Sequence, residues 1–219
     1  MTPATVHNVN FHGVGEPPRP LSDGEAMVWL GRDRFVSTLD ALRGRSDVRL
    51  SFDDSNRSDV DVALPLLLER EMTATFFVLA GRLENPHHLG VSDLVALAAA
   101  GMSIGSHGMD HLDWRRCSGD KLGHELTESR RILEQVLGVA VTHVAIPFGS
   151  YDRRVLDRVR RGGYERVFTS DGGPARGDAW LQRRTTVGND GVAARDLFPS
   201  PSSQKTAQRA LKGMVKRWR

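Results

Sequence analysis

Residues 47–80 read DVRLSFDDSNRSDVDVALPLLLEREMTATFFVLA, and this stretch decides the fold. The short apolar runs VRLSF and TATFFVLA are typical of buried strands. Between them, residues 63–71 have the apolar spacing of a helix. Pro65 either kinks a helix that begins at Ser58 or lies in the first turn of one that begins near Leu64. The stretch therefore predicts a strand, a helix and a second strand in succession.

The same alternation continues on both sides of this stretch. Apolar runs predict strands, and apolar spacing predicts helices. The further strands are 6–11, 102–107, 141–148 and 165–171, and the further helices are 31–44, 92–100, 118–138 and 151–163. This alternation predicts an α/β fold with a parallel sheet and helices outside it, either doubly wound or closed as a barrel. In both architectures functional residues collect at the carboxyl ends of the strands.

The composition fits one globular domain and excludes several classes of protein. The 219 residues are 39% hydrophobic and 26% charged, which is enough for one core. The single cysteine, Cys117, excludes an internal disulfide. No signal-type N-terminus and no run of ~20 apolar residues is present, so a cytoplasmic location is expected. Six of the cations lie in residues 199–219, and without them the net charge of +3 turns negative, so nucleic-acid binding is not expected.

Two acidic residues, Asp53 and Asp54, follow the strand that ends at Phe52. One interpretation is a solvated turn in which an acid or Ser55 caps a helix. Consecutive strand residues point to opposite faces, so both carboxylates reach one site only if the chain turns there. The following residues, SNRS, favour such a turn. The pair is therefore also a candidate for a functional site.

His107 and His111, in GSHGMDH, follow another predicted strand and stand four residues apart. This spacing puts both imidazoles on one side of a helical turn. Two histidines and one carboxylate form a divalent-metal site that leaves positions for water and substrate. With Asp54 at a neighbouring strand end, the three residues predict such a site; two surface histidines on a loop are the alternative.

Three motifs in this order resemble the polysaccharide deacetylase family, in the branch associated with exopolysaccharides. SFDDSN carries its Asp-Asp motif, SHGMDH its His-x-x-x-His motif and IPFG its Pro-aromatic-Gly motif. TATFFVLAG and GMSIGSH are also similar to the family, so the resemblance covers residues 48–172. The resemblance implies a distorted (β/α) barrel of about seven strands.

The resemblance also implies a role for each motif residue. By motif position Asp53 is the catalytic base, and Asp54, His107 and His111 hold one divalent cation, for which the ligand types favour zinc. Such a cation polarises the acetyl carbonyl and lowers the pKa of water towards ~7, so that a carboxylate completes deprotonation.

The substrate and oxyanion side of the site is assigned to two segments. A backbone N–H after the strand that carries IPFG would stabilise the oxyanion, so Pro147, Phe148 and Gly149 are candidates. Asp171 ends a predicted strand, where it bonds a substrate hydroxyl or tunes a neighbour. Trp29, Trp114 and Trp180 form either a sugar-stacking wall or ordinary packing.

The chain departs from the family pattern at three places. Many members have an arginine in the third motif that orients the base; it is missing here, and Arg183 or Arg184 replaces it, with Arg184 assigned to the substrate side. Ser55 stands where glycine is usual. No histidine follows His143, so His12, at the end of the first predicted strand, is assigned as the general acid. An ordinary strand-end histidine is the alternative for this residue.

We divide the chain into a catalytic domain, residues 1–198, and a basic amphipathic tail, residues 199–219. KTAQRALKGMVKRWR has apolar residues at helical spacing and cations on the opposite face. Such a helix either lies on an anionic membrane surface, which would place the protein peripherally at the inner membrane, or packs on the barrel with a solvated face.

The sequence thus predicts an enzyme that removes acetyl groups from N-acetylated sugars in a poly- or oligosaccharide, in surface or exopolysaccharide biosynthesis. Two alternatives stay open. One is hydrolysis of another small C–N bond by the same barrel. The other is an inactive relative that binds carbohydrate or scaffolds an assembly, which the missing third-motif arginine favours. The sequence defines neither the sugar nor the oligomeric state.

Overall fold

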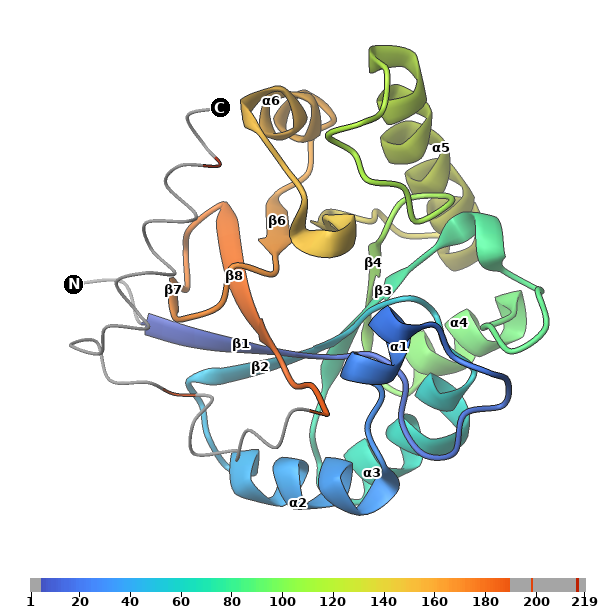
Figure 1. The fold of residues 1–219 in the computed structure, drawn as a ribbon, viewed down its shortest axis with the longest axis vertical. Helices are drawn as coiled ribbons and strands as arrows, with labels where there is room; N and C mark the ends of the chain where they lie inside the picture. The colour runs from blue at the N-terminus through green and yellow to red at the C-terminus, as the bar shows by residue number, and fades with distance from the viewer. Residues whose placement is uncertain (1–4, 190–197, 199–215, 217–219) are drawn as a thin grey trace.

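The strands of the chain form a closed parallel barrel with helices outside it (Figure 1). The computed structural model describes residues 5–189, Phe198 and Lys216. The barrel strands are β1 (Thr5–Phe11), β2 (Val48–Phe52), β3 (Ala74–Val78), β4 (Ser103–Ser106), β5 (His143–Ala145), β6 (Arg166–Thr169) and β8 (Leu181–Thr186). Each pairs in parallel with the next, and β1 closes the barrel because it pairs with both β2 and β8. The predicted distorted barrel of seven strands is confirmed.

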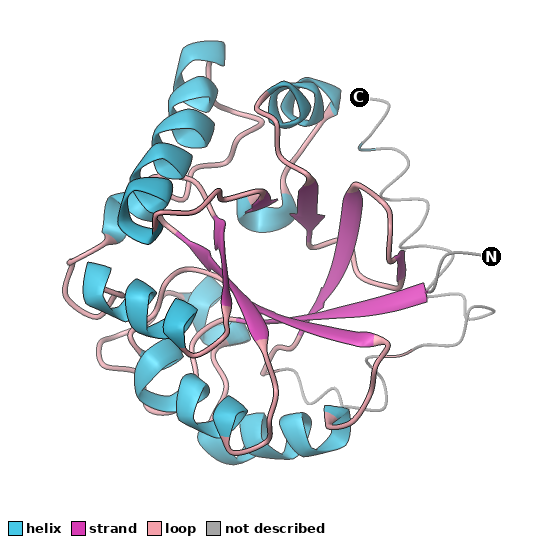
Figure 2. Cartoon of the chain, turned by 180° about the vertical axis from the view of Figure 1, so that it is seen from behind, coloured by secondary structure: helices cyan, strands magenta, loops and turns pink. Residues whose placement is uncertain are grey.

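The short β7 (Ala175–Arg176) lies outside this ring and pairs antiparallel with the beginning of β1. Helices cover the outer side of the barrel, as Figure 2 shows from behind. They are α2 (Arg32–Leu42), α3 (Leu64–Leu68), α4 (Val91–Ala99), α5 (Gly119–Leu137) and α6 (Arg153–Arg161). Because the strands are covered on both faces, some of them, such as β3, are continuous apolar runs rather than alternating ones. No helix in the described part of the chain is long and apolar enough to cross a membrane.

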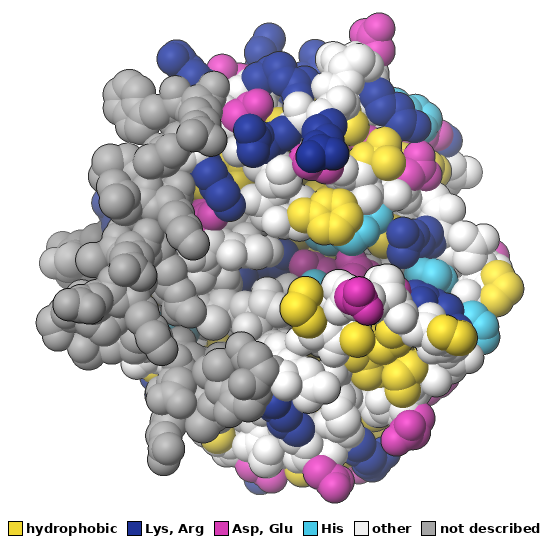
Figure 3. All heavy atoms as spheres, viewed as in Figure 1, with side chains coloured by type: hydrophobic (Ala, Val, Ile, Leu, Met, Phe, Trp, Pro, Cys, Tyr) yellow, Lys and Arg dark blue, Asp and Glu magenta, His cyan; other side chains and the backbone are white. Residues whose placement is uncertain are grey.

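Among the elements without a counterpart in the sequence prediction are β8 and α1 (Asp23–Val28). A capping box starts α1: the Ser22 N–H donates to the Glu25 carboxylate (3.0 Å), and the Glu25 N–H donates to Ser22 Oγ (3.4 Å). Residues of α1 border a hollow on the face of the molecule shown in Figure 3. The segment between β1 and β2 therefore contributes to the candidate site.

The structure combines the two interpretations of Pro65. A π-helical turn, η1 (Asp59–Ala63), follows Ser58 and continues directly into α3, with Pro65 in the first turn of α3. Proline has no N–H to donate, so the helical pitch changes where that hydrogen bond would be lost. The predicted tail falls outside the described residues, apart from Lys216.

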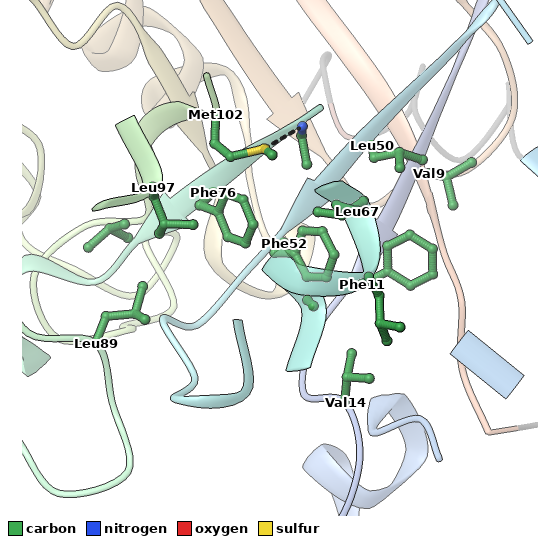
Figure 4. Close-up of a cluster of buried hydrophobic side chains, with 14 of the residues drawn as sticks. Val9, Phe11, Val14, Leu50, Phe52, Leu67, Phe76, Leu89, Leu97 and Met102 are labelled. Atoms are coloured by element: carbon green, nitrogen blue, oxygen red, sulfur yellow. Dashed lines mark hydrogen bonds between the residues drawn. The ribbon is translucent and has the colours of Figure 1, made fainter. Parts of the chain in front are cut away.

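Phenylalanines form the centre of the main core, between the strands and helices α2 and α3. Phe52 stacks on Phe76, with ring centroids 4.8 Å apart, and on Phe11 at 5.3 Å. Phe35 of α2 meets Phe11 edge-on at 5.1 Å. Figure 4 shows Phe11, Phe52 and Phe76 side by side, with Leu67 of α3 next to them. All five side chains are at most 1% exposed, so this core fixes the strands whose ends carry the site.

We expect Phe52→Ala to lower the free energy of unfolding by about 3–5 kcal/mol, because the change leaves a cavity between Phe11 and Phe76. Urea denaturation followed by circular dichroism measures the loss. Val95→Ala, at a position that is 51% exposed on α4, is the control and should change stability by less than ~0.5 kcal/mol. Equal effects of the two substitutions would contradict the assignment of the core.

Candidate active site

The predicted functional residues gather at the carboxyl ends of neighbouring strands. Asp53 and Asp54 follow β2, His107 follows β4 and His12 follows β1. β1 and β2 are direct neighbours, and β3 lies between β2 and β4. These residues and His111 line one cavity of about 590 Å³. The candidate residues therefore lie at the carboxyl ends of the strands, as expected for a parallel barrel.

A left-handed turn directs the Asp53–Asp54 pair into the cavity. Asp54 has φ +76° and Ser55 has φ +59°, a region that residues with side chains rarely adopt. The Ser55 hydroxyl accepts a hydrogen bond from the Leu79 N–H (2.8 Å). The turn that the sequence required is present. The hydrogen bond gives a physical reason for serine at a position where the family that the motifs resemble usually has glycine.

Asp54, His107 and His111 converge with metal-ligand geometry. Nε2 of His107 lies 3.4 Å from Asp54 Oδ1, and Nε2 of His111 lies 3.3 Å from the same oxygen. One ligand atom from each residue lies within 4.8 Å of the other two. Asp54 Oδ1 is buried and accepts no hydrogen bond from the described residues, so a cation would satisfy it. Two imidazoles and one carboxylate fit a divalent cation.

The surroundings of the two histidines prepare them for this role. Nδ1 of His107 lies 2.9 Å from the Ala145 carbonyl, so this nitrogen donates and Nε2 faces the cluster. Burial lowers the pKa of His107, but Asp53 and Asp54 outweigh it and raise the pKa above its usual value. A cation therefore competes with a proton for Nε2. Burial, partly opposed by Asp54, lowers the pKa of His111 to about 4, so this imidazole is neutral at neutral pH.

Arg184 and Asp53 form a buried, two-pronged ion pair. Nη1 of Arg184 donates to Asp53 Oδ1 and Nη2 donates to Asp53 Oδ2, both at 2.7 Å. The two side chains are 0% and 3% exposed. Burial raises the pKa of Asp53, but the Arg184 guanidinium, followed by His107, outweighs it and holds the pKa below its usual value. The carboxylate is therefore ionised and fixed in orientation.

Of the two arginines that the sequence offered as partners of the base, Arg184 makes the contact. The sequence also grouped it with the substrate-binding residues, but its guanidinium has no exposed surface. Its Nη1 also donates to Asn10 Oδ1 (2.8 Å) and Ser51 Oγ (3.2 Å). Sequence reasoning missed Asn10 and Ser51. Their signal is a polar residue inside each of two apolar strands.

His12 lies at the edge of the same cavity. Its Nε2 is 4.0 Å from Asp53 Oδ2, and its side chain is 17% exposed. Its Nδ1 has no hydrogen-bond partner among the described residues. The structure thus brings His12 beside the predicted base, while its role as an acid stays a prediction.

A further buried acid, Asp59 at the start of η1, was not singled out from the sequence. It is 1% exposed, and its Oδ1 has no partner within the described part of the chain. Burial first, then the charges of Asp54 and Asp53, raise its pKa well above the usual value. This environment favours the protonated form of Asp59 over the charged one.

Glu125 of α5, also missed, orders the loop that carries His111. Its buried carboxylate accepts hydrogen bonds from the N–H groups of Met109 (3.0 Å) and Asp110 (3.3 Å). It also accepts one from the indole of Trp114 (3.3 Å). The signal in the sequence is an acid within the mostly apolar buried stripe of α5. A loop fixed in this way holds His111 at a constant distance from His107.

The turn η3 (Pro147–Gly149) forms another side of the cavity, although its three residues do not contribute equally. Phe148 has φ +58°, is 64% exposed and lines the cavity, with its ring centroid 4.3 Å from that of His111. The Gly149 N–H donates to the Ile146 carbonyl (3.0 Å) and is not available to an oxyanion. Pro147 is buried and has no N–H. Of the three residues of η3, Phe148 therefore remains the candidate for contact with the substrate or the oxyanion.

Asp171 bonds within the protein rather than facing the cavity. Its Oδ2 accepts hydrogen bonds from the Tyr151 hydroxyl (2.5 Å) and the Thr169 hydroxyl (2.9 Å). Its Oδ1 accepts one from Nζ of Lys216 (2.8 Å), which also donates to the Gly149 carbonyl (2.9 Å). The side chain is 1% exposed. Of the two roles predicted for Asp171, this geometry favours support of a neighbour over contact with substrate.

The three tryptophans do not form a wall of the cavity. Each indole N–H of Trp29, Trp114 and Trp180 donates to a protein oxygen within 3.3 Å. None of the three lines the cavity. They take the packing role that the sequence left open, and the large apolar groups exposed at the cavity are Met27 and Phe148.

The chain is similar to polysaccharide deacetylases in sequence and in fold. A family model described as polysaccharide deacetylase matches residues 42–167. YxkH of Bacillus subtilis (strain 168) is 27% identical over 158 residues, 72% of this chain and 54% of YxkH. A chitooligosaccharide deacetylase of Rhizobium leguminosarum bv. trifolii is 32% identical over 145 residues, 64% of this chain and 65% of that protein. The chain thus spans 54% and 65% of these curated relatives.

A solved structure gives the same result for the fold alone. Streptococcus pyogenes deacetylase PplD, in complex with acetate, matches with a TM-score of 0.78 at 21% identity. The match covers 90% of this chain and 97% of PplD. The α/β barrel is therefore shared well beyond the residues that the family model covers.

We expect Arg184→Met to lower the free energy of unfolding by about 3–5 kcal/mol, because it leaves the Asp53 carboxylate buried without its counter-charge. Urea denaturation measures the loss. The double variant Arg184→Met/Asp53→Asn removes the uncompensated charge and should recover a large part of it. No recovery in the double variant would mean that Arg184 stabilises the barrel by packing rather than through its charge.

Proposed function

Because this chain belongs to the polysaccharide deacetylase family, whose model matches residues 42–167, we propose that it is a metal-dependent hydrolase that removes acetyl groups from N-acetylated sugars. One observation carries this proposal: the ionised Asp53 carboxylate shares a cavity with the Asp54, His107 and His111 cluster. Hydrolysis of an amide needs an activated water, a stabilised oxyanion and a proton for the leaving nitrogen. The cavity offers a group for each need.

The first step uses the two carboxylates that follow β2. Asp54, His107 and His111 would hold a divalent cation, for which the ligand types favour zinc. Such a cation would supply Lewis acidity, which polarises an acetyl carbonyl and lowers the pKa of water towards ~7. Asp53, kept ionised by Arg184, accepts a proton from the attacking water, whose oxygen bonds to the acetyl carbon.

The second step breaks the C–N bond. His12 donates a proton to the sugar nitrogen, which leaves as a free amine while the acetyl group leaves as acetate. Its Nε2 is 4.0 Å from Asp53 Oδ2, so base and acid reach the same amide group. The Phe148 N–H is the remaining backbone donor of η3 for the oxyanion, because Pro147 has none and Gly149 uses its own.

The proposed substrates are N-acetylated poly- or oligosaccharides. The relative from Rhizobium leguminosarum is named for chitooligosaccharides, which supports this class. A role in surface or exopolysaccharide biosynthesis is a finer proposal. It is supported by the position of His12, which precedes the other motifs, as in the branch that the sequence resembles.

We expect His107→Ala to lose the bound divalent cation, because it removes one of three ligands and the remaining two bind the cation more weakly. Metal content after dialysis against a limiting zinc concentration, measured by mass spectrometry, checks this. His124→Ala, an exposed histidine on α5, is the matched control and should keep the metal content of the parent. A His107→Ala protein that binds zinc at the parent level would rule out the proposed centre.

We expect Asp53→Asn and His12→Ala to keep the metal but to lower acetate release by about 10²–10⁴-fold, because each removes a proton-transfer group. The assay is acetate release from N-acetylated chitooligosaccharides. Unchanged turnover in His12→Ala would remove this residue from the mechanism. For the parent protein, bound metal without acetate release from any sugar would favour another C–N bond, and neither metal nor acetate would favour an inactive relative.

A further inference from the structure

Arg82, an arginine without a carboxylate partner among the described residues, lies at the cavity that holds the candidate metal centre. It ends the short helix η2 (Ala80–Arg82), directly after β3, and its side chain lines the cavity together with Asp54 and His111. Figure 3 shows the hollow near the middle of this face, with acidic side chains at its bottom and basic and histidine side chains along its edges. No role in the proposed reaction uses Arg82.

The partner of Arg82 orients it without neutralising it. Nη1 of Arg82 lies 3.5 Å from Nε2 of His88, and Nδ1 of His88 lies 3.1 Å from the Pro86 carbonyl. Nδ1 therefore donates, and the lone pair on Nε2 faces the guanidinium. Burial first, with Arg82 and Arg19 also contributing, lowers the pKa of His88 and keeps it neutral. Among the described residues Arg82 forms no ion pair with a carboxylate.

Other arginines near the cavity are neutralised. Arg184 pairs with Asp53 inside the barrel. Arg19 pairs with Glu25, a residue of α1 that lines the cavity. Arg82 differs from both because its remaining N–H groups have no acceptor in the part of the chain that the structure describes.

The charge of Arg82 contributes to the net charge of the cavity. With neutral histidines and no cation the charges cancel, since two ion pairs are neutral and Asp54 balances Arg82. A divalent cation on Asp54, His107 and His111 leaves two positive charges in excess. A cleft with a net positive charge attracts an anionic ligand and disfavours a cationic one.

We propose that the cavity prefers N-acetylated sugars that carry a carboxylate on the acetylated unit or its neighbour, and that Arg82 binds this carboxylate. The inference rests on the proposed function, because it assumes an acetylated sugar in the cavity. A guanidinium offers parallel N–H donors that match the two oxygens of a carboxylate. Arg82 is thus a specificity-determining residue, distinct from the residues that transfer protons.

Binding to a protein that does not turn over substrate tests the preference directly. We would load the Asp53→Asn protein with zinc and titrate it by calorimetry with a neutral N-acetylated oligosaccharide and with one of equal length that carries a carboxylate. The acidic ligand should bind about tenfold or more tightly, the size expected for a hydrogen-bonded charge pair. Adding Arg82→Gln should remove this difference, and Arg82→Lys should restore part of it.

Arg57→Gln is the matched control. Arg57 is another arginine outside the barrel, but it bonds Asp61 and Asp93 and does not line the cavity. Its substitution should leave both affinities unchanged. Two outcomes would overturn the proposal. One is equal affinity for the two ligands in the protein that keeps Arg82. The other is an equal loss of affinity for both ligands in Arg82→Gln.

Acetate release by the enzyme with Asp53 intact separates this inference from the proposed function. Arg82→Gln should raise KM for the acidic oligosaccharide about tenfold with little change in kcat, and should leave both parameters unchanged for the neutral one. Acetate release without any preference overturns the carboxylate site alone. Binding of the acidic ligand that depends on Arg82, but without acetate release from either ligand, supports the carboxylate site and counts against the deacetylase function.

Discussion

The buried ion pair between Arg184 and Asp53 is the interaction on which the rest of the site depends. Two charges removed from water are stable only if their geometry is good and their remaining hydrogen-bonding groups are satisfied. Here the pair is two-pronged, and Asn10 and Ser51 take up further donors and acceptors. These residues come from β8, β1 and β2, which are the strands that close the barrel. The contacts that close the barrel therefore also fix the orientation of the Asp53 carboxylate.

This pair also separates the roles of two adjacent aspartates. Asp53 is stabilised as an anion by a guanidinium, whereas Asp54 lies among histidines and has one oxygen without a hydrogen bond from the described part of the chain. The left-handed turn at Asp54 and Ser55 makes the separation geometrically possible. Chemically identical neighbours thus acquire different electrostatic properties from their surroundings. Asp59 has no such partner among the described residues, and burial raises its pKa well above the usual value.

Most strands and helices were predictable because burial on both faces of a parallel strand leaves a continuous apolar run. β8 was missed for the opposite reason. Its sequence, LQRRTT, resembles an exposed segment. Gln182 and Arg184 are nevertheless buried, and their side chains form hydrogen bonds with residues on or directly after other strands. α1 was missed because six residues give too little apolar periodicity, although its capping box was present in the sequence. The tryptophans were ambiguous because the packing of an indole depends on neighbours far along the chain.

The sequence by itself determined the order of strands and helices, the three motifs and the chemistry of the candidate ligands, because each is a local property of a few consecutive residues. Only the tertiary structure decided between Arg183 and Arg184, since Arg184 and Asp53 are 131 positions apart in the chain. It also decided that Gly149 uses its own N–H, that Asp171 bonds internally and that Arg82 is left unpaired among the described residues. Each of these outcomes depends on which distant groups meet when the barrel closes, and no local pattern encodes that.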